Sequence, residues 1–214
     1  MINLARLIEY TNLNPQITGR DVDQLIHEAL DFEVFGVCVP PFWVKRASRE
    51  IGQKDLQLIT VVGFPLGYQM TETKMEEARL ALRDGANEID MVMNISAFKD
   101  GMPWPKIEFA KMSKLVHDSE ALLKVIIEVG YLSDEEILKA AKLCADAGVD
   151  FVKTSTGTTG IGATAQQVKL LRGALPSNVG IKASGGIKTK QQAIEFIEAG
   201  ADRLGTSNAS SLIT

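Results

Sequence analysis

Six charged residues lie inside segments that otherwise have the apolar character of buried β-strands. They are Glu9, Asp90, Lys124, Glu128, Lys153 and Lys182. A charge in such a segment is expensive to bury unless it is paired or faces a polar site. Because side chains alternate along a strand, we expect these charges on one face and residues such as Val152 and Ile181 on the other, toward helices. The pattern predicts a charged site enclosed by strands.

Lys153 and Lys182 lie on consecutive predicted strands. If these strands are neighbours, their backbones run about 4.8 Å apart, and the two ammonium groups disfavour each other's charge. Desolvation adds to this effect, so one of the two lysines should be partly neutral near pH 7. A neutral amine is the nucleophile that attacks a carbonyl group to form a Schiff base. Asp90 could then move protons, and Lys124 could pair with Asp90 and hold it ionised.

A structural explanation of the same lysines competes with the catalytic one. A lone lysine in a strand often lies at a frayed end and reaches solvent, and buried ion pairs can be purely structural. Three lysines and one acid within successive strands favour a functional site. The residue pattern by itself leaves both explanations open.

Two glycine-rich turns predict an anion site. Gly185 and Gly186 follow Ser184 at the end of one predicted strand, and Gly205 begins a Gly-Thr-Ser-Asn turn at the end of the next. Glycine lets backbone N–H groups approach a ligand, and helix N-termini favour negative charge. We expect a phosphate at these turns, although ordinary turn chemistry would explain either one alone.

Eight short apolar segments, separated by helical patterns, must position these residues. The predicted strands cover residues 7–11, 36–40, 58–64, 88–93, 122–128, 151–155, 179–184 and 203–207. Helical patterns end at Gly85, Gly148 and Gly200, where glycine supplies a left-handed cap. Helix starts are marked by capping boxes. These boxes begin at Ser133 and Thr164, with weaker versions at Thr18 and Thr189.

Eight βα units predict an α/β fold, a single (β/α)8 TIM barrel over residues 1–214 as one domain. A doubly wound open sheet is the alternative. The charges within the strands favour the barrel, because an open sheet would have to bury them whereas a barrel can turn them into its mouth.

Composition excludes several function classes. The chain has 214 residues, 45% hydrophobic and 23% charged, with a net charge of −4. This is ordinary globular composition, and without a basic face nucleic acid is not an expected partner. Cys38 and Cys144 lack the spacing of a disulfide framework or a metal site, and His27 and His117 are expected at the surface. We expect a cytoplasmic protein without a signal peptide, a membrane span, a nucleotide or a metal.

Over nearly its whole length the sequence resembles the deoxyribose-phosphate aldolase family. The segments that carry the resemblance are DFVKTSTG at 150–157, EIDMV at 88–92, IKASGG at 181–186, LKVIIE at 123–128 and GFPLG at 63–67. In this comparison Lys153 matches the lysine that forms the Schiff base, Asp90 the proton-relay aspartate, and Lys182 the second catalytic lysine. The family pattern falls on the residues that the burial argument selects.

The resemblance implies a class I, metal-free aldolase without a cofactor, which reversibly cleaves 2-deoxy-D-ribose 5-phosphate to acetaldehyde and D-glyceraldehyde 3-phosphate. Lys153 would form the imine, and Asp90, Lys182 and a water would shuttle protons. The expected substrate-binding residues are Lys124, Thr156, Gly185, Gly186, Gly205, Ser207 and Asn208. The expected partners are small molecules, the sugar phosphate and aldehydes, and a homo-oligomer such as a dimer is left open.

The chain departs from the family pattern at several points. Glu9 stands where the family usually has an aspartate, Thr158 where some members have a phosphate-binding lysine, and Asn208 where a second serine is common. The latter two changes bear on phosphate affinity and on the acceptance of unphosphorylated aldehydes. A long C-terminal tail that ends in tyrosine, which some members use in proton transfer, is not expected in a chain that ends at Thr214.

Two other functions compete with the aldolase. One is a phosphate-binding barrel isomerase or epimerase that uses Asp90 as its base, and the other is a non-catalytic relative that binds a sugar phosphate or another partner. The complete set of Lys153, Lys182 and Asp90 argues against the non-catalytic relative.

Lys153→Arg separates the aldolase from the isomerase. A guanidinium stays protonated and cannot act as the amine nucleophile, so the substitution should abolish aldol cleavage, measured as acetaldehyde release. An isomerase that uses Asp90 as its base would retain substantial activity in the same variant.

Overall fold

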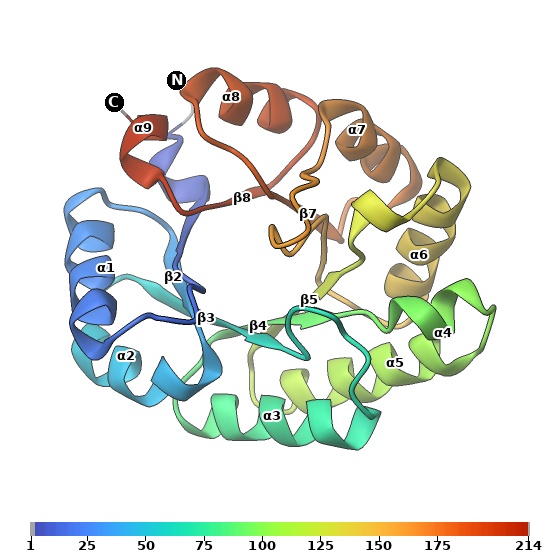
Figure 1. Cartoon of the computed structure of the whole chain (residues 1–214), viewed down its shortest axis with the longest axis horizontal. Coiled ribbons are helices and arrows are strands. Elements are labelled where there is room, and N and C mark those ends of the chain that lie inside the picture. Colours follow the sequence, from blue (N-terminus) through green and yellow to red (C-terminus); the bar gives the residue numbers. More distant parts are fainter. Residues whose placement is uncertain (1–2, 214) are drawn as a thin grey trace.

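The computed structural model describes residues 3–213, and its eight strands close into a barrel (Figure 1). The strands are β1 (Ile8–Thr11), β2 (Gly36–Val39), β3 (Gln57–Val62), β4 (Glu88–Val92), β5 (Leu122–Ile126), β6 (Phe151–Lys153), β7 (Gly180–Ser184) and β8 (Arg203–Thr206). Each strand pairs in parallel with the next, and β8 pairs with β1. The predicted (β/α)8 TIM barrel is confirmed, and the open sheet is wrong because its edge strands would not pair.

Helices surround the barrel on its outside (Figure 1). They are α1 (Gly19–Asp31), α2 (Val44–Ile51), α3 (Thr71–Arg83), α4 (Ile95–Lys99), α5 (Trp104–His117), α6 (Asp134–Asp146), α7 (Ala165–Ala174), α8 (Lys190–Glu198) and α9 (Ala209–Ile213). Three short 3-10 turns are η1 (Ala5–Leu7), η2 (Pro41–Trp43) and η3 (Val129–Tyr131). Within residues 3–213, none of the helices combines the length and apolar character that crossing a membrane requires.

The local signals for helix ends act as predicted. Reciprocal capping boxes begin at Thr18 (α1), Ser133 (α6), Thr164 (α7) and Thr189 (α8). Gly85, Gly148 and Gly200 have φ of 108°, 73° and 109°. These values lie in a region that residues with a Cβ rarely adopt. Local side-chain chemistry therefore sets many of the points where the chain turns back toward the sheet.

Strand alternation divides the side chains between two environments. Val152 and Ile181 are fully buried in the large apolar cluster between the strands and the helices, as the sequence predicts. A smaller cluster inside the barrel contains Cys38, Ile59 and Val61. Both cysteines are free and buried, and both histidine side chains are exposed, at 65% for His27 and 42% for His117.

β5 and β6 end earlier than the sequence predicts. Glu128 lies beyond β5 in a left-handed conformation, with φ 54° and ψ 68°, and Lys153 is the last residue of β6 rather than a central one. The left-handed residue interrupts the ladder between β5 and β6. Ile127 N–H donates to the carbonyl of Lys153 and Val129 N–H to that of Thr154, so donors two residues apart reach acceptors on consecutive residues. The expectation that Glu128 belongs to the strand is thus corrected. It lies at the rim where β5 enters its loop.

Candidate active site

Asp90 is the centre of the buried charges. Its Oδ1 accepts a hydrogen bond from Lys124 Nζ at 3.0 Å, and its Oδ2 accepts from Lys153 Nζ at 2.8 Å and from Lys182 Nζ at 2.6 Å. Asp90 is opposite Lys124 in the β4–β5 register, and Lys153 is opposite Lys182 in the β6–β7 register. The four side chains are 0–4% exposed. Four successive strands therefore bring one carboxylate into contact with three lysines.

Two further buried carboxylates face the same lysines. Glu9 on β1 contacts Lys182, and its Oε1 lies 3.4 Å from Lys124 Nζ. Glu88, at the start of β4, also contacts Lys124. These three carboxylates and three lysines can balance one another's charge inside the barrel, which makes the burial of each one tolerable.

The two lysines on Asp90 Oδ2 differ in their proton affinity. Burial lowers the pKa of Lys153, and the attraction of Asp90 only partly offsets this because Lys182 adds repulsion. Burial also opposes a charge on Lys182, but the attraction of Asp90 and Glu9 outweighs it and raises the pKa of that lysine. Asp90 itself resists protonation, since the three lysines overcome the effect of its burial and lower its pKa. Of these two lysines, Lys153 is therefore the one whose pKa shifts toward the neutral amine that the sequence argument expects.

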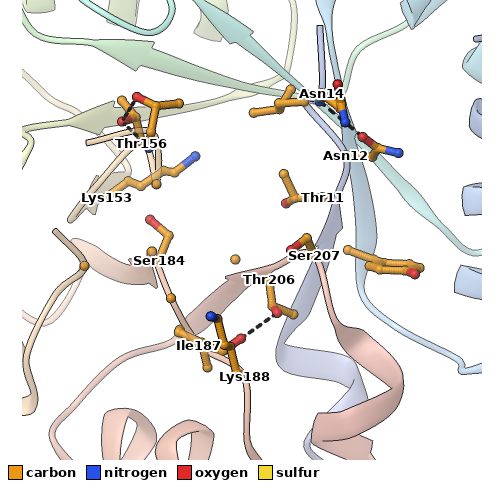
Figure 2. Close-up of a pocket in the computed structure, with 18 of the residues that line it drawn as sticks. Thr11, Asn12, Asn14, Lys153, Thr156, Ser184, Ile187, Lys188, Thr206 and Ser207 are labelled. Carbon is orange, nitrogen blue, oxygen red and sulfur yellow. Dashed lines mark hydrogen bonds between the residues drawn. The ribbon is translucent and has the colours of Figure 1, made fainter. Parts of the chain in front are cut away.

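A cavity of 680 Å³ lies at the C-terminal ends of the strands, and Lys153 contributes to its lining. Figure 2 shows the amine of Lys153 directed into this space. Asp90, Lys124 and Lys182 do not line the cavity and are 0% exposed. The amine of Lys153 is thus the part of the ion network that a ligand can reach, and the other charges support it from below.

Most of the expected binding residues line the same cavity. Those that do are Thr156, Gly185, Gly186, Gly205 and Ser207. Lys124 and Asn208 do not: Lys124 is enclosed by carboxylates, and Asn208 N–H donates to Thr206 Oγ1 at 3.0 Å. The structure therefore gives Lys124 a place in the ion network rather than on the cavity wall.

Two loops of the cavity meet through glycines. A Cβ on Gly162, in the β6–α7 loop, would lie 2.1 Å from the Gly185 carbonyl oxygen, and Gly185 itself has φ of 94°. Any side chain at Gly162 would force these loops apart, because real Cβ atoms do not approach backbone so closely. The glycine-rich turn after β7 thus also fixes the neighbouring loop against it.

Sequence reasoning missed several cavity residues. They are Tyr10, Thr11, Asn12, Leu13, Asn14, Leu25, Phe64, Gly157, Gly160, Ile161, Gly162, Ile187 and Lys188. A signal existed for Phe64, which lies in the GFPLG segment, and for Lys188, which closely follows the Gly-Gly turn. The polar run after β1 was a weaker signal, because its asparagines make local turns: Asn12 accepts from Asn14 N–H and Asn14 from Gln16 N–H.

Asp90→Asn should lower the free energy of unfolding at about pH 7 by about 3–5 kcal/mol, because it leaves three buried lysines without their shared anion. The folded state lowers the pKa of Asp90. The stability that its ionised form contributes is complete above the pKa of the unfolded chain, and it is lost as pH falls toward the folded value. Urea titrations at several acidic pH values should show a smaller loss of stability on acidification in the variant.

Asp118→Asn is the matched control for this experiment. Asp118 is 62% exposed, and among the described residues its carboxylate pairs with the exposed Lys114, four residues earlier in the last turn of α5, so its loss should change little. Equal effects of the two substitutions would contradict the structural weight given to Asp90.

Known proteins resemble the chain along its length. The profile of the DeoC/LacD family aldolases matches residues 6–208. The chain is 47% identical over 211 residues to deoxyribose-phosphate aldolase of Aciduliprofundum boonei, covering 98% of this chain and 95% of the relative. It is 46% identical over 210 residues to the enzyme of that name from Thermococcus gammatolerans, covering 97% and 93%.

Solved structures agree with this match. QR15, an aldolase, has a TM-score of 0.94 and 39% identity, covering 100% of this chain and 95% of that one. Deoxyribose phosphate aldolase from Aeropyrum pernix, described as a unique tetramer, has a TM-score of 0.92 and 34% identity, covering 98% and 89%. The chain therefore belongs to the DeoC/LacD family of aldolases.

Proposed function

We propose that this chain is a class I aldolase that reversibly cleaves 2-deoxy-D-ribose 5-phosphate to acetaldehyde and D-glyceraldehyde 3-phosphate. The relatives named deoxyribose-phosphate aldolase support this substrate. The observation that carries the proposal is Lys153, whose amine lines the cavity while burial lowers its pKa. Such an amine can attack a carbonyl group, as Schiff-base formation requires.

The first half of the reaction joins the substrate to Lys153. The neutral Nζ attacks C1 of the open-chain sugar, and the carbinolamine loses one water to become an iminium. Asp90 Oδ2 contacts both Lys153 and Lys182. A proton released by the attacking nitrogen can therefore pass through this carboxylate to the carbonyl oxygen, which becomes the carbinolamine hydroxyl. A second proton, from Lys182 directly or through a water, lets that hydroxyl leave as water.

The second half breaks the carbon–carbon bond. The hydroxyl on C3 loses its proton to the relay and becomes the carbonyl of D-glyceraldehyde 3-phosphate, while the electrons of the C2–C3 bond move toward the iminium and leave an enamine. Protonation of the enamine carbon and hydrolysis by one water release acetaldehyde and restore the amine. Lys182 is well suited to supply that proton, because Asp90 and Glu9 raise its pKa and keep it charged.

The phosphate is proposed to bind at the two glycine-rich turns. Gly185, Gly186, Gly205 and Ser207 line one side of the cavity together with Lys188. In Figure 2, Lys188 lies on the same side of the cavity as Thr206 and Ser207. Among the described residues that line the cavity, Lys188 is the one cation besides the catalytic lysine. Charge-assisted hydrogen bonds from a lysine suit a phosphate.

Lys188→Ala should raise KM for the phosphorylated substrate by about 10- to 100-fold, since a hydrogen bond to a charged group contributes about 1.5–3 kcal/mol. The substitution should leave kcat/KM for unphosphorylated 2-deoxyribose nearly unchanged. Lys190→Ala is the control, because Lys190 is exposed and its Nζ donates to the Ile213 carbonyl at 3.2 Å. An equal loss of kcat/KM with the phosphorylated and the unphosphorylated substrate would contradict the placement of Lys188 in the phosphate site.

The wider setting is also a proposal. A single-domain cytoplasmic enzyme that acts on small molecules fits the free, buried cysteines. We also propose that the chain forms a homo-oligomer, specifically a dimer. Exposed apolar side chains support this, because exposed apolar surface marks protein–protein contacts. They are Tyr68, Met70, Met102 and Trp104, at 50–69% exposure.

Borohydride trapping tests the proposed function. Reduction in the presence of acetaldehyde should fix a secondary amine on Lys153, which peptide mapping by mass spectrometry would locate. Lys153→Arg should give no adduct, and Lys169→Arg, at an exposed position on α7, should label like the unaltered chain. Absence of an adduct, or an adduct confined to another lysine, would refute the assignment.

A further inference from the structure

Glu128 is a buried acid that the proposed reaction does not use. Its side chain is turned toward the first residues of the β6–α7 loop, and the residue is 1% exposed. Its Oε2 accepts two hydrogen bonds from Thr156, one from the backbone N–H at 3.1 Å and one from the hydroxyl at 2.5 Å. Thr156 lines the cavity, and Figure 2 shows it beside Lys153. Glu128 therefore touches a cavity residue without lining the cavity itself.

The backbone of Glu128 adopts a conformation that is unusual for its residue type. Among residues 3–213, the non-glycine residues with positive φ are Glu33, Glu120 and Glu128. The first two follow helices α1 and α5, whereas Glu128 lies two residues beyond the end of barrel strand β5. A non-glycine residue in such a conformation costs about 1–3 kcal/mol, and such residues concentrate at functional sites. Its Oε1 is moreover buried without a hydrogen-bond partner among the described residues, which also disfavours a purely stabilising role.

The contact with Glu128 determines whether the Thr156 hydroxyl acts as a donor or as an acceptor toward other groups. The Thr156 hydroxyl donates its one proton to Glu128 Oε2, so Oγ1 can only accept further hydrogen bonds. One donor to this oxygen is Thr158 N–H at 3.2 Å, and the Thr158 hydroxyl lies 2.9 Å away. A ligand hydroxyl can take the place of the Thr158 hydroxyl. This side of the cavity therefore presents an acceptor that suits a hydroxyl group and disfavours a phosphate oxygen.

The proposed reaction indicates which hydroxyl this acceptor meets. The open-chain substrate has two hydroxyls, on C3 and C4, between the iminium carbon and the phosphate. The C3 hydroxyl must face the proton relay below the cavity, because it loses its proton during cleavage. The C4 hydroxyl remains free to donate to the wall between Lys153 and the phosphate turns. In the direction of synthesis it is the hydroxyl next to the aldehyde of the acceptor.

We propose that Glu128 is a positioning residue that holds Thr156 Oγ1 as a hydrogen-bond acceptor for the hydroxyl on C4, and that it thereby selects acceptor aldehydes that carry a 2-hydroxyl. This inference rests on the proposed aldolase function. It adds a specificity element on the β6–α7 loop, which lies against the Gly185 turn and carries Thr158 in place of a lysine.

The test compares two unphosphorylated acceptors with acetaldehyde as the donor. D-Glyceraldehyde carries the 2-hydroxyl and propanal lacks it. In Glu128→Leu, kcat/KM for D-glyceraldehyde should fall by about tenfold, while that for propanal should change little. Thr156→Val should show the same selective fall, and the double variant should lose no more than either single one, because both changes remove one interaction. Thr156→Ser and Glu128→Gln keep the oxygens involved and should retain most of the preference.

Each outcome bears on the proposal. Equal losses for the two acceptors in both Glu128→Leu and Thr156→Val would overturn it, because a merely structural contact does not distinguish propanal from D-glyceraldehyde. If Glu128→Leu does not fold, the Thr156 variants decide by the same ratio. A borohydride adduct on Lys153 with an unchanged ratio would refute the role of Glu128 and leave the aldolase intact. No adduct in the unaltered chain would overturn both.

Discussion

The carboxylate of Asp90 is the interaction on which the site depends. Three lysines from β5, β6 and β7 contact it within a closed barrel, where their charges would otherwise be prohibitive. The two lysines that share Oδ2 are not equivalent. Lys182 has a second anion in Glu9 and keeps its proton, whereas Lys153 has Asp90 alone and its burial prevails. One shared anion thus contacts two adjacent lysines whose pKa values shift in opposite directions.

The barrel separates these charges from the loop residues that line the rest of the cavity. The ion network forms a floor of 0–4% exposed side chains, and the loops beyond the strand ends form the wall above it. Lys153 is the last residue of its strand, so its side chain belongs to the ion network and also lines the cavity. The contact between Gly162 and Gly185 ties the loop after β6 to the loop after β7.

The sequence by itself was sufficient to predict the barrel and the cluster of buried charges inside it. Strand alternation and reciprocal capping boxes are local features, so the strands and the capped helices followed from spacing alone. Asp90, Lys153 and Lys182 stood out because a charge within an apolar strand is costly to bury unless it is paired or faces a polar site. Their register also followed, because consecutive strands of a barrel are neighbours.

Only the tertiary structure decided which residues line the cavity and which lysine has a lowered pKa. Lys124 and Lys153 look alike in sequence, yet one is enclosed by three carboxylates and the other opens onto the cavity. Glu128 was expected within a strand, but its left-handed backbone turns it to Thr156. Proton affinity and access to a cavity depend on distances between residues far apart in the chain, and local spacing does not encode these distances.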